Sequence, residues 1–347
     1  MEFRIGNKLI GDNHPVFIIA EMSCNHLQNY DYAVEIIKKA KEAGADAIKL
    51  QTYTPDTMTI DCHNEYFSLK GTIWEGKTLY ELYQEAYTPW EWQPKLKKIA
   101  EELGLIFFST PFDKTAVDFL EEMEVPVYKI ASYEITDIPL IEYIAEKQKP
   151  VIFSIGMATV TDIDLVLSAI RNKQNNDIAL LKCVSAYPTP IEETNLLTIK
   201  NIPETFGVIP GLSDHTPTIT TSILSVALGA RIIEKHLTLD RKLGGPDAKF
   251  SLNPEEFKEM VDSVREAEKA LGHITYALNE KQKRSRETAR SLFVVKDIQK
   301  GEAFSEENIR SIRPGYGLHP KYYQQILGKS AKKDLERGTP LKWEFVE

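Results

Sequence analysis

Cysteine is scarce in this chain, and long apolar runs are absent. The 347 residues include three cysteines, Cys24, Cys62 and Cys183, far apart in sequence. An odd number at wide spacing argues against a disulfide framework and against paired zinc ligands, so we expect reduced, buried thiols. No apolar run approaches the ~20 residues that span a bilayer, and the N-terminal residues lack a signal-peptide core. We therefore expect a cytoplasmic protein without a membrane partner.

Positive charge is also in deficit. The chain has 42 Lys and Arg against 51 Asp and Glu, a formal net charge of -9. General nucleic-acid binding needs a basic surface that displaces counterions, so no nucleic-acid partner is expected. A small anionic substrate remains compatible with this charge, because a few lysines can converge locally. With 42% hydrophobic and 27% charged residues, the chain has enough apolar material for a sizeable core.

What the chain does contain is a regular alternation of short apolar runs and amphipathic stretches. Eight runs rich in Val, Ile and Phe are each followed by apolar residues at three- and four-residue steps. Eight such units predict an α/β fold, a parallel sheet closed into a (β/α)₈ TIM barrel. A doubly wound open sheet is the alternative, but no GxGxxG follows the first run. The runs span residues 16–21, 45–51, 105–110, 125–131, 150–156, 178–184, 206–215 and 230–237.

The alternation ends in a polar, charged stretch at 271–290. We predict a barrel domain at 1–275, a linker at 276–289 and a compact β-rich domain at 290–347. The last segment has turn signals such as Arg-Gly-Thr-Pro at 337–340. A domain this small is expected to need a partner surface for its stability.

Polar residues stand at or just after the ends of the apolar runs. All strands of a barrel open onto one face at their carboxyl ends, where active sites are built. The Gly-Gly-Pro-Asp sequence at 244–247 suits no strand or helix interior and is expected to shape a loop above that face. The polar residues are Glu21, Lys49, Thr110, Lys129, Ser154, Ser185, His215 and His236.

His215 and His236 end adjacent predicted strands. Two neutral imidazoles that face one cavity can bind a divalent cation such as Mn²⁺, with water completing the shell. A single histidine at a strand end is more often a satisfied polar side chain. Two on neighbouring strands, each flanked by a carboxylate (Asp214 and Glu234), leave both interpretations open.

Lys49 and Lys129 end the second and fourth predicted strands. A lysine that points into a barrel mouth is costly unless it meets an anion or acts as a base or Schiff-base former. The alternative is a side chain that extends to solvent. Lysines ringed by hydroxyls suit a phosphate and a carboxylate, which need charge and several donors. The hydroxyls expected in this layer are those of Ser109, Thr110, Ser132, Ser154, Ser185 and Ser213.

Glu21 ends the first predicted strand. In a mouth lined with lysines its carboxyl is expected to have a low pKa, which suits binding a sugar hydroxyl or accepting a proton. A salt bridge to one of the lysines is the structural alternative.

Eight motifs occur in order along the chain: AEMSCNH, IKLQTY, STPFD, YKIAS, SIGMA, CVSAYPTP, GLSDHT and EKHLTLDRKLGGPDAKFS. With these motifs the whole chain resembles the sialic acid synthase family, whose members join phosphoenolpyruvate to a hexosamine-derived sugar. The C-terminal segment, with RPGYG at 313–317, is similar to the antifreeze-like SAF domain, a β-clip fold. The resemblance implies a transferase that forms a carbon–carbon bond.

The resemblance also implies roles for individual residues. His215 and His236 would bind a divalent metal, Mn²⁺ or otherwise Mg²⁺ or Co²⁺, and would be catalytic together with Glu21, Lys49 and Lys129. Phosphoenolpyruvate would lie among Lys49, Thr110, Lys129, Ser132, Ser154, Ser185 and Ser213. The acetamido-hexose would contact Glu21, Gln51, Tyr187, Asp247, Phe250 and Arg313, the last from the other subunit of a domain-swapped homodimer.

Finer features resemble the branch of the family that makes pseudaminic acid. Ser185 stands where sialic acid synthases typically carry Asn, GPDAKFS replaces GPDHxAS, and a long insertion follows the second run. The implied sugar is 2,4-diacetamido-2,4,6-trideoxy-L-altrose. Phe250, Trp74 and Tyr80 are the candidates for contact with its C6 methyl and second acetamido group.

Three alternatives remain at this stage. Within the family, the product could be N-acetylneuraminate or legionaminate. A Schiff-base aldolase with Lys129 or Lys49 as nucleophile is a different enzyme class. A carbohydrate- or ice-binding role of the C-terminal domain is a third, but it leaves the ionisable residues of the barrel unexplained.

Overall fold

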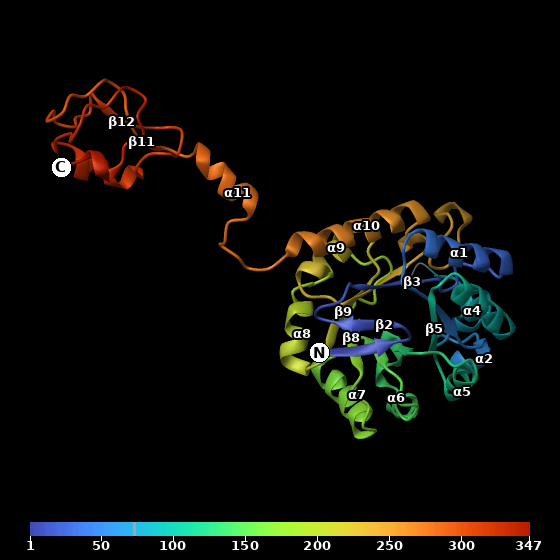
Figure 1. Ribbon diagram of the computed structural model, residues 1–347. Helices are drawn as coiled ribbons and strands as arrows, with labels where there is room; N and C mark the ends of the chain where they lie inside the picture. The colour runs from blue at the N-terminus through green and yellow to red at the C-terminus, as the bar shows by residue number, and fades with distance from the viewer. Residues whose placement is uncertain (72–73) are drawn as a thin grey trace. The chain divides into compact units, whose positions relative to one another are not determined.

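Figure 1 shows the computed structural model of the protein, in which residues 1–71 and 74–347 are described. The chain divides into two compact units, Met1–Gly272 and His273–Glu347. This division lies close to the predicted barrel boundary at 275, and the predicted linker at 276–289 falls within the second unit. Among the described helices, none is long and apolar enough to cross a membrane.

The first unit is a closed barrel of eight parallel strands, which confirms the predicted fold and excludes the open sheet. The last strand pairs with the first, so that His236 lies opposite Glu21. The strands are almost wholly buried, as their continuous apolar runs require. They are β3 (Phe17–Glu21), β4 (Ala47–Thr52), β5 (Ile106–Pro111), β6 (Tyr128–Ile130), β7 (Val151–Ser154), β8 (Ile178–Lys182), β9 (Ile209–Asp214) and β10 (Ile232–His236).

Amphipathic helices surround the barrel (Figure 1). The last of them begins with a capping box between Asn253 and Glu256 and has Pro254 in its first turn. Its buried face follows the helical period, with Phe257, Met260, Val261 and Val264 against the barrel. The helices are α1 (Tyr30–Glu42), α4 (Gln93–Glu102), α5 (Lys114–Glu122), α6 (Ile138–Ala145), α7 (Val160–Asn172), α8 (Thr198–Phe206), α9 (Thr220–Ala227) and α10 (Pro254–Leu271).

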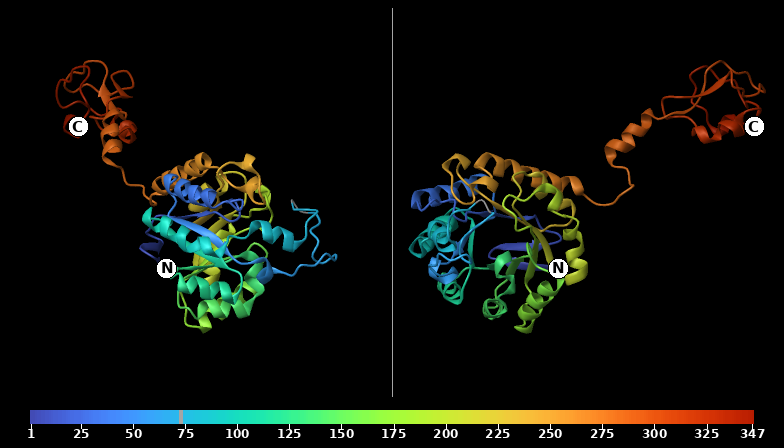
Figure 2. Two further views of the ribbon diagram at one scale, coloured as in Figure 1. Left: turned by 90° about the vertical axis from the view of Figure 1, so that its right-hand side faces the viewer. Right: turned by 180° about the vertical axis from the view of Figure 1, so that it is seen from behind.

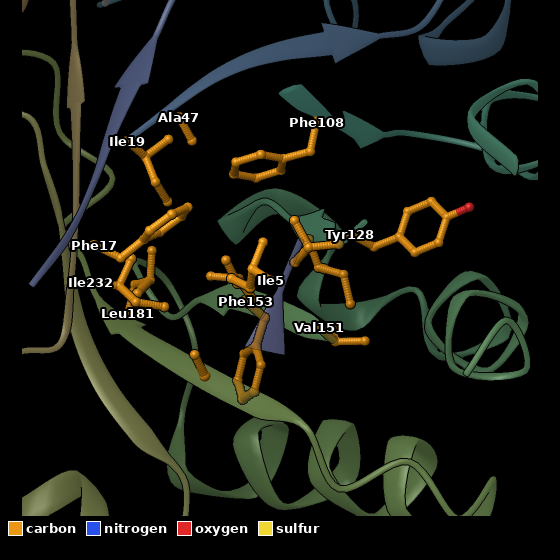
Figure 3. Packing of buried hydrophobic residues seen from close by; sticks show 14 of the residues in the cluster. Ile5, Phe17, Ile19, Ala47, Phe108, Tyr128, Val151, Phe153, Leu181 and Ile232 are labelled. Atoms are coloured by element: carbon orange, nitrogen blue, oxygen red, sulfur yellow. The ribbon is translucent and has the colours of Figure 1, made fainter. Parts of the chain in front are cut away.

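An N-terminal hairpin, which the sequence analysis did not predict, packs against the barrel. Strands β1 (Glu2–Ile5) and β2 (Lys8–Gly11) are antiparallel, and Ile5 and Ile10 are buried. Ile5 belongs to the same core cluster as Phe17 and Ile232, and Figure 3 shows the three side chains grouped together. Lys8 pairs with Asp46, just before β4, at 3.0 Å. The hairpin therefore lies at the amino ends of the strands, away from the mouth.

A long insertion leaves the barrel between β4 and α4. It contains α2 (Pro55–Met58) and α3 (Leu79–Ala86), and each helix begins with a threonine in a capping box. Figure 2 (left) shows the insertion on the side of the barrel opposite the N-terminal hairpin. The insertion thus adds to the end of the barrel where the strands have their carboxyl ends.

The second unit has a core of its own. Strands β11 (Ser291–Val294) and β12 (Ile309–Ile312) pair antiparallel, and the short helices are α11 (Glu280–Ser285) and α12 (Tyr323–Ile326). The buried cluster includes Leu292, Phe304, Ile309, Ile326 and Leu341. The unit is therefore the small β-containing domain that the sequence predicted.

Candidate active site

The mouth of the barrel holds a cavity of about 350 Å³. Its position follows from the two-residue alternation of each strand. Phe17 and Ile19 precede Glu21 on the inner face of β3, and Ile232 precedes Glu234 and His236 on β10. The cavity brings together these predicted residues: Glu21, Lys49, Gln51, Trp74, Thr110, Lys129, Ser132, Ser154, Tyr187, Ser213, His215, His236, Asp247 and Phe250.

Four other predicted residues lie elsewhere. Ser109 is outside the hydroxyl layer, because the strand alternation turns it away from the cavity and its Oγ lies 2.7 Å from Thr52 Oγ1. Tyr80 does not line the cavity, and its hydroxyl donates to Asp56 Oδ1. Arg313 is exposed in the second unit. Ser185 is in the supporting layer described next.

Ser185 and Ser132 flank Gly156, which has no side chain to separate them. A Cβ at Gly156 would lie 2.9 Å from both the Ser132 Oγ and the Ser185 backbone nitrogen, closer than real Cβ contacts. The Gly156 backbone N–H donates to Ser132 Oγ at 3.0 Å. Within the described residues, the buried Ser185 Oγ has no hydrogen-bond partner, so it retains bonding capacity for another group.

The cavity floor is a lattice of alternating lysines and carboxylates. Lys49 Nζ lies 2.7 Å from Glu21 Oε2 and donates to Thr110 Oγ1 at 3.2 Å. Lys129 Nζ donates to Ser154 Oγ at 2.7 Å. Glu234 lies between the lysines. Its Oε2 is 3.9 Å from Lys49 Nζ, and its Oε1 is 3.9 Å from Lys129 Nζ. Both lysines therefore have partners inside the protein and do not extend to solvent.

The two carboxyls of this floor have pKa values shifted in opposite directions. It raises the pKa of Glu21 to about 7, and Lys49 offsets only part of that rise. The expectation of a low pKa for Glu21 was therefore wrong, because removal from water outweighs the neighbouring ammonium group. Burial also raises the pKa of Glu234, but Lys129 and Lys49 outweigh it and the net shift is downward. Glu21 can thus hold or release a proton near neutral pH, whereas Glu234 stays ionised.

The pKa values of the two lysines are also shifted in opposite directions. Burial lowers the pKa of Lys129, and Glu234 only partly compensates. At Lys49, burial also lowers the pKa, but the combined effect of Glu21 and Glu234 raises it above its usual value. Lys49 is therefore the more firmly charged of the two.

The rings of His215 and His236 are 5.3 Å apart between centroids. His215 Nδ1 lies 3.1 Å from the Val184 carbonyl oxygen, which fixes Nδ1 as the donor and leaves Nε2 available as a ligand. In the part of the chain that the structure describes, His236 Nδ1 is buried without a hydrogen-bond partner, 3.6 Å from Asp247 Oδ2. Burial holds the pKa of His236 well below its usual range, so the ring is neutral, the form in which an imidazole can bind a metal.

These features fit a divalent cation held by two histidines, although the wider donor set is small. The described residues include no cluster of three or more His, Cys, Asp and Glu side chains arranged as a metal cage. The orphaned nitrogen of His236 is the observation that favours a cation. Water or substrate oxygens would have to complete its coordination.

The outer part of the cavity is aromatic. The Tyr187 ring centroid lies 4.6 Å from that of His215 and 5.1 Å from that of Phe250. Trp74 lies 6.0 Å from Tyr187, and its indole N–H donates to the Pro246 carbonyl at 3.2 Å. Gly245, at φ +105°, permits the turn that carries Asp247 into the cavity.

Among the titratable lining residues that the sequence analysis missed is Glu134. Glu134 follows Ser132 in the loop after β6, and burial raises its pKa to about 7. Across the described residues, its Oε2 has no hydrogen-bond partner. The signal was available, because Glu134 stands two positions after a serine that the sequence analysis had assigned to the mouth.

The family model described as "NeuB family" matches residues 36–276. The chain belongs to the NeuB family. A SAF domain model matches residues 289–347, so both predicted parts of the resemblance are confirmed. The positions of the NeuB-family motifs in this chain coincide with the strand ends that form the cavity.

The chain is similar to NeuB-family proteins over nearly its whole length. It is 48% identical to the pseudaminic acid synthase of Campylobacter jejuni over 339 residues, 98% of each chain. It is 48% identical to that of Helicobacter pylori over 334 residues, which cover 96% of this chain and 98% of the relative. Among solved structures, the N-acetylneuraminic acid synthetase of Leptospira borgpetersenii, crystallised with citrate, aligns with a TM-score of 0.73 at 34% identity. That alignment covers 82% of this chain and 95% of the other.

A buried ion pair lies directly behind the two histidines. Asp214 precedes His215, Lys235 precedes His236, and the two charged residues face each other in the β9–β10 register. Lys235 Nζ is 2.9 Å from Asp214 Oδ2, and both side chains are almost fully buried. Thr221 and Ser222 donate to the same carboxylate oxygen. The pair therefore links the two strands and the start of α9 at the point where the histidines leave the sheet.

We expect Asp214→Asn to lower the free energy of unfolding by about 3–5 kcal/mol, because it leaves the Lys235 charge buried and unpaired. Asp12→Asn is the matched control: Asp12 pairs with Arg231 at 3.1 Å on the surface, where such pairs contribute about 0–1 kcal/mol. Urea unfolding followed by circular dichroism measures both. Similar small losses in the two variants would contradict a stabilising role for the buried pair.

Proposed function

We propose that the chain condenses phosphoenolpyruvate with 2,4-diacetamido-2,4,6-trideoxy-L-altrose and water, and releases pseudaminic acid and phosphate. The observation that carries this proposal is the 48% identity to a pseudaminic acid synthase over 98% of both chains. The branch-specific features at Ser185 and in GPDAKFS support the same sugar. The cytoplasmic location expected from the sequence stays a prediction.

The floor of the cavity suits phosphoenolpyruvate. Lys49 and Lys129 provide charge for its phosphate and carboxylate, and their partners hold them in place before a substrate binds. The hydroxyls of Thr110, Ser132, Ser154, Ser185 and Ser213 would add donors. Ser213 at present donates to Glu234 Oε1 at 2.9 Å, so it also orients the carboxylate between the lysines.

We propose His215 and His236 as the protein ligands of a divalent metal, Mn²⁺ or otherwise Mg²⁺ or Co²⁺. When bound, such an ion would act as a Lewis acid toward the aldehyde oxygen of the open-chain sugar. The Val184 carbonyl orients His215 for this role. Asp247 stands close enough to His236 to orient it or to contact the sugar.

The bond changes follow from the two substrates. C3 of phosphoenolpyruvate attacks the aldehyde carbon, which leaves C2 electron-poor. Water adds at C2, and the tetrahedral intermediate expels phosphate by cleavage of the C–O bond. Lys49 and Lys129 stabilise the negative charge of the phosphate and carboxylate throughout. Glu21, whose pKa of about 7 allows it to hold a proton near neutral pH, can exchange one with the sugar.

The sugar would lie between the floor and the aromatic mouth. Gln51 donates to Glu21 Oε1 at 3.0 Å and to Ser23 Oγ at 2.9 Å, which orients the Glu21 carboxyl toward the cavity. Tyr187, Phe250 and Asp247 would surround the central carbons of the open-chain sugar. We propose that Arg313 of a second subunit completes the site in a domain-swapped homodimer, because an arginine can donate several hydrogen bonds to acetamido and hydroxyl oxygens.

Phosphate release from phosphoenolpyruvate should be faster with 2,4-diacetamido-2,4,6-trideoxy-L-altrose than with N-acetylmannosamine. We expect kcat/KM to differ by about tenfold or more, the range in which single apolar groups discriminate substrates. A phosphate assay measures the rates, and mass spectrometry of the product verifies the nine-carbon acid. Equal or reversed preference would instead assign the chain to neuraminate or legionaminate synthesis.

His236→Ala is expected to lower kcat/KM by about 100-fold or more, because Lewis-acid assistance contributes several kcal/mol. It should also abolish Mn²⁺ binding in calorimetry while the melting temperature stays unchanged. His273→Ala, at an exposed position, is the control. Activity that survives EDTA but is lost on treatment with borohydride, which reduces and traps an imine between a lysine and the substrate, would point instead to a Schiff-base aldolase.

Co-expression of Arg313→Ala with His236→Ala tests the proposed dimer. If Arg313 acts on the partner's barrel, a heterodimer contains one doubly altered site and one intact site. We therefore expect each single variant to be inactive and the purified heterodimer to recover up to about half of the wild-type activity. A verified heterodimer without recovery would mean that each site is built from a single chain, whereas an active Arg313→Ala variant would mean that Arg313 is dispensable.

A further inference from the structure

Helix α3 carries an apolar stripe that the barrel core does not use. Leu79, Leu82, Tyr83 and Ala86 recur at i, i+3, i+4 and i+7, so they lie on one face of the helix. All four line the cavity. As far as the described residues show, the main hydrophobic cluster of the barrel includes none of them. An amphipathic helix normally buries such a face against a core, and here the face borders an open site instead.

Other apolar residues extend this stripe into a wall. Tyr53, which directly follows β4, lies 5.7 Å from Tyr83 and 5.1 Å from Phe112 between ring centroids. Met58 and Leu69 come from the same insertion and also line the cavity. We call the set formed by Tyr53, Met58, Leu69, Leu79, Leu82, Tyr83, Ala86 and Phe112 the apolar wall.

The chemistry of the two proposed substrates decides which one meets this wall. Phosphoenolpyruvate is anionic, and its charges match the lysines of the floor. The sugar reacts at its aldehyde carbon, which must lie near the floor and the histidines, so its far end extends toward the mouth. An apolar lining that faces a cavity marks a site for apolar groups. At the far end of the proposed sugar these groups are the C6 methyl and the methyl of the 4-acetamido group.

We infer that the apolar wall binds the deoxygenated, acetamido-bearing end of the sugar and that Leu79 and Leu82 determine the specificity for it. This inference rests on the proposed function and adds the residues that recognise the far end. It differs from the sequence expectation, which named Phe250, Trp74 and Tyr80. Phe250 packs against both histidine rings, and Tyr80 lies outside the cavity lining, so neither has the position that the far end requires.

The test uses the full-length protein with Leu79→Gln and Leu82→Gln, which keep side-chain size and helix propensity but make the wall polar. We expect each to raise the KM for the diacetamido sugar about tenfold or more, the effect of losing an apolar contact in a pocket. The KM for phosphoenolpyruvate should change less than about twofold. Leu82→Met keeps the wall apolar and should raise the KM for the sugar less than Leu82→Gln does.

Leu165→Gln is the matched control, since Leu165 is 51% exposed on α7, outside the cavity lining. Two results would overturn the inference: an unchanged KM for the sugar, or an equal rise of both KM values with a lower melting temperature, which would mark the stripe as purely structural. If the unmodified protein itself releases no phosphate with this sugar, the proposed function fails and the inference fails with it. If the unmodified protein is active and the Leu79→Gln and Leu82→Gln variants show no rise in the KM for the sugar, only the inference is wrong.

Discussion

The whole site depends on the closure of the sheet by hydrogen bonding between β10 and β3. This pairing puts residues 234–236, late in the barrel, beside residues 19–21 at its start. Because inner side chains repeat every two residues, each strand passes from apolar positions in the barrel centre to polar ones at the mouth. A shift of one residue in that pairing would turn Glu234 and His236 out of the cavity and Lys235 into it.

Closure also gathers charges that would be costly if buried singly. Lys49, Lys129, Glu21 and Glu234 are all nearly inaccessible to water, and each depends on the others for compensation. The Asp214–Lys235 pair shows the same principle on the outer face of the sheet, where hydroxyls and backbone carbonyls satisfy the remaining bonds. In the inner lattice the lysines pair with carboxylates and hydroxyls, and one backbone carbonyl, that of Ile130, accepts a further hydrogen bond from Lys129.

The strands of the barrel could be predicted because a strand buried on both faces leaves a continuous apolar run. The N-terminal hairpin was missed because its strands have four residues each and only Phe3, Ile5 and Ile10 mark its buried face. Most of the residues predicted from their positions at or after the ends of the runs line the cavity. Ser109 was misplaced because the alternation of sides was not applied within the strand. The pKa of Glu21 was misjudged because composition shows which charges are near but not how much water remains. The stripe on α3 could have been read from the spacing at 79, 82, 83 and 86.

The separation of α3 from the main core has a consequence for how such a protein can diversify. Substitutions within a barrel strand alter packing that the entire first unit shares. The cavity face of α3 contributes no residue to that cluster among the described residues, so substitutions there leave the packing of the barrel core unchanged. The half of the site that is proposed to bind the anion can stay constant while the insertion changes. New sugars could therefore be accommodated, in nature or by directed evolution, without first gaining spare stability.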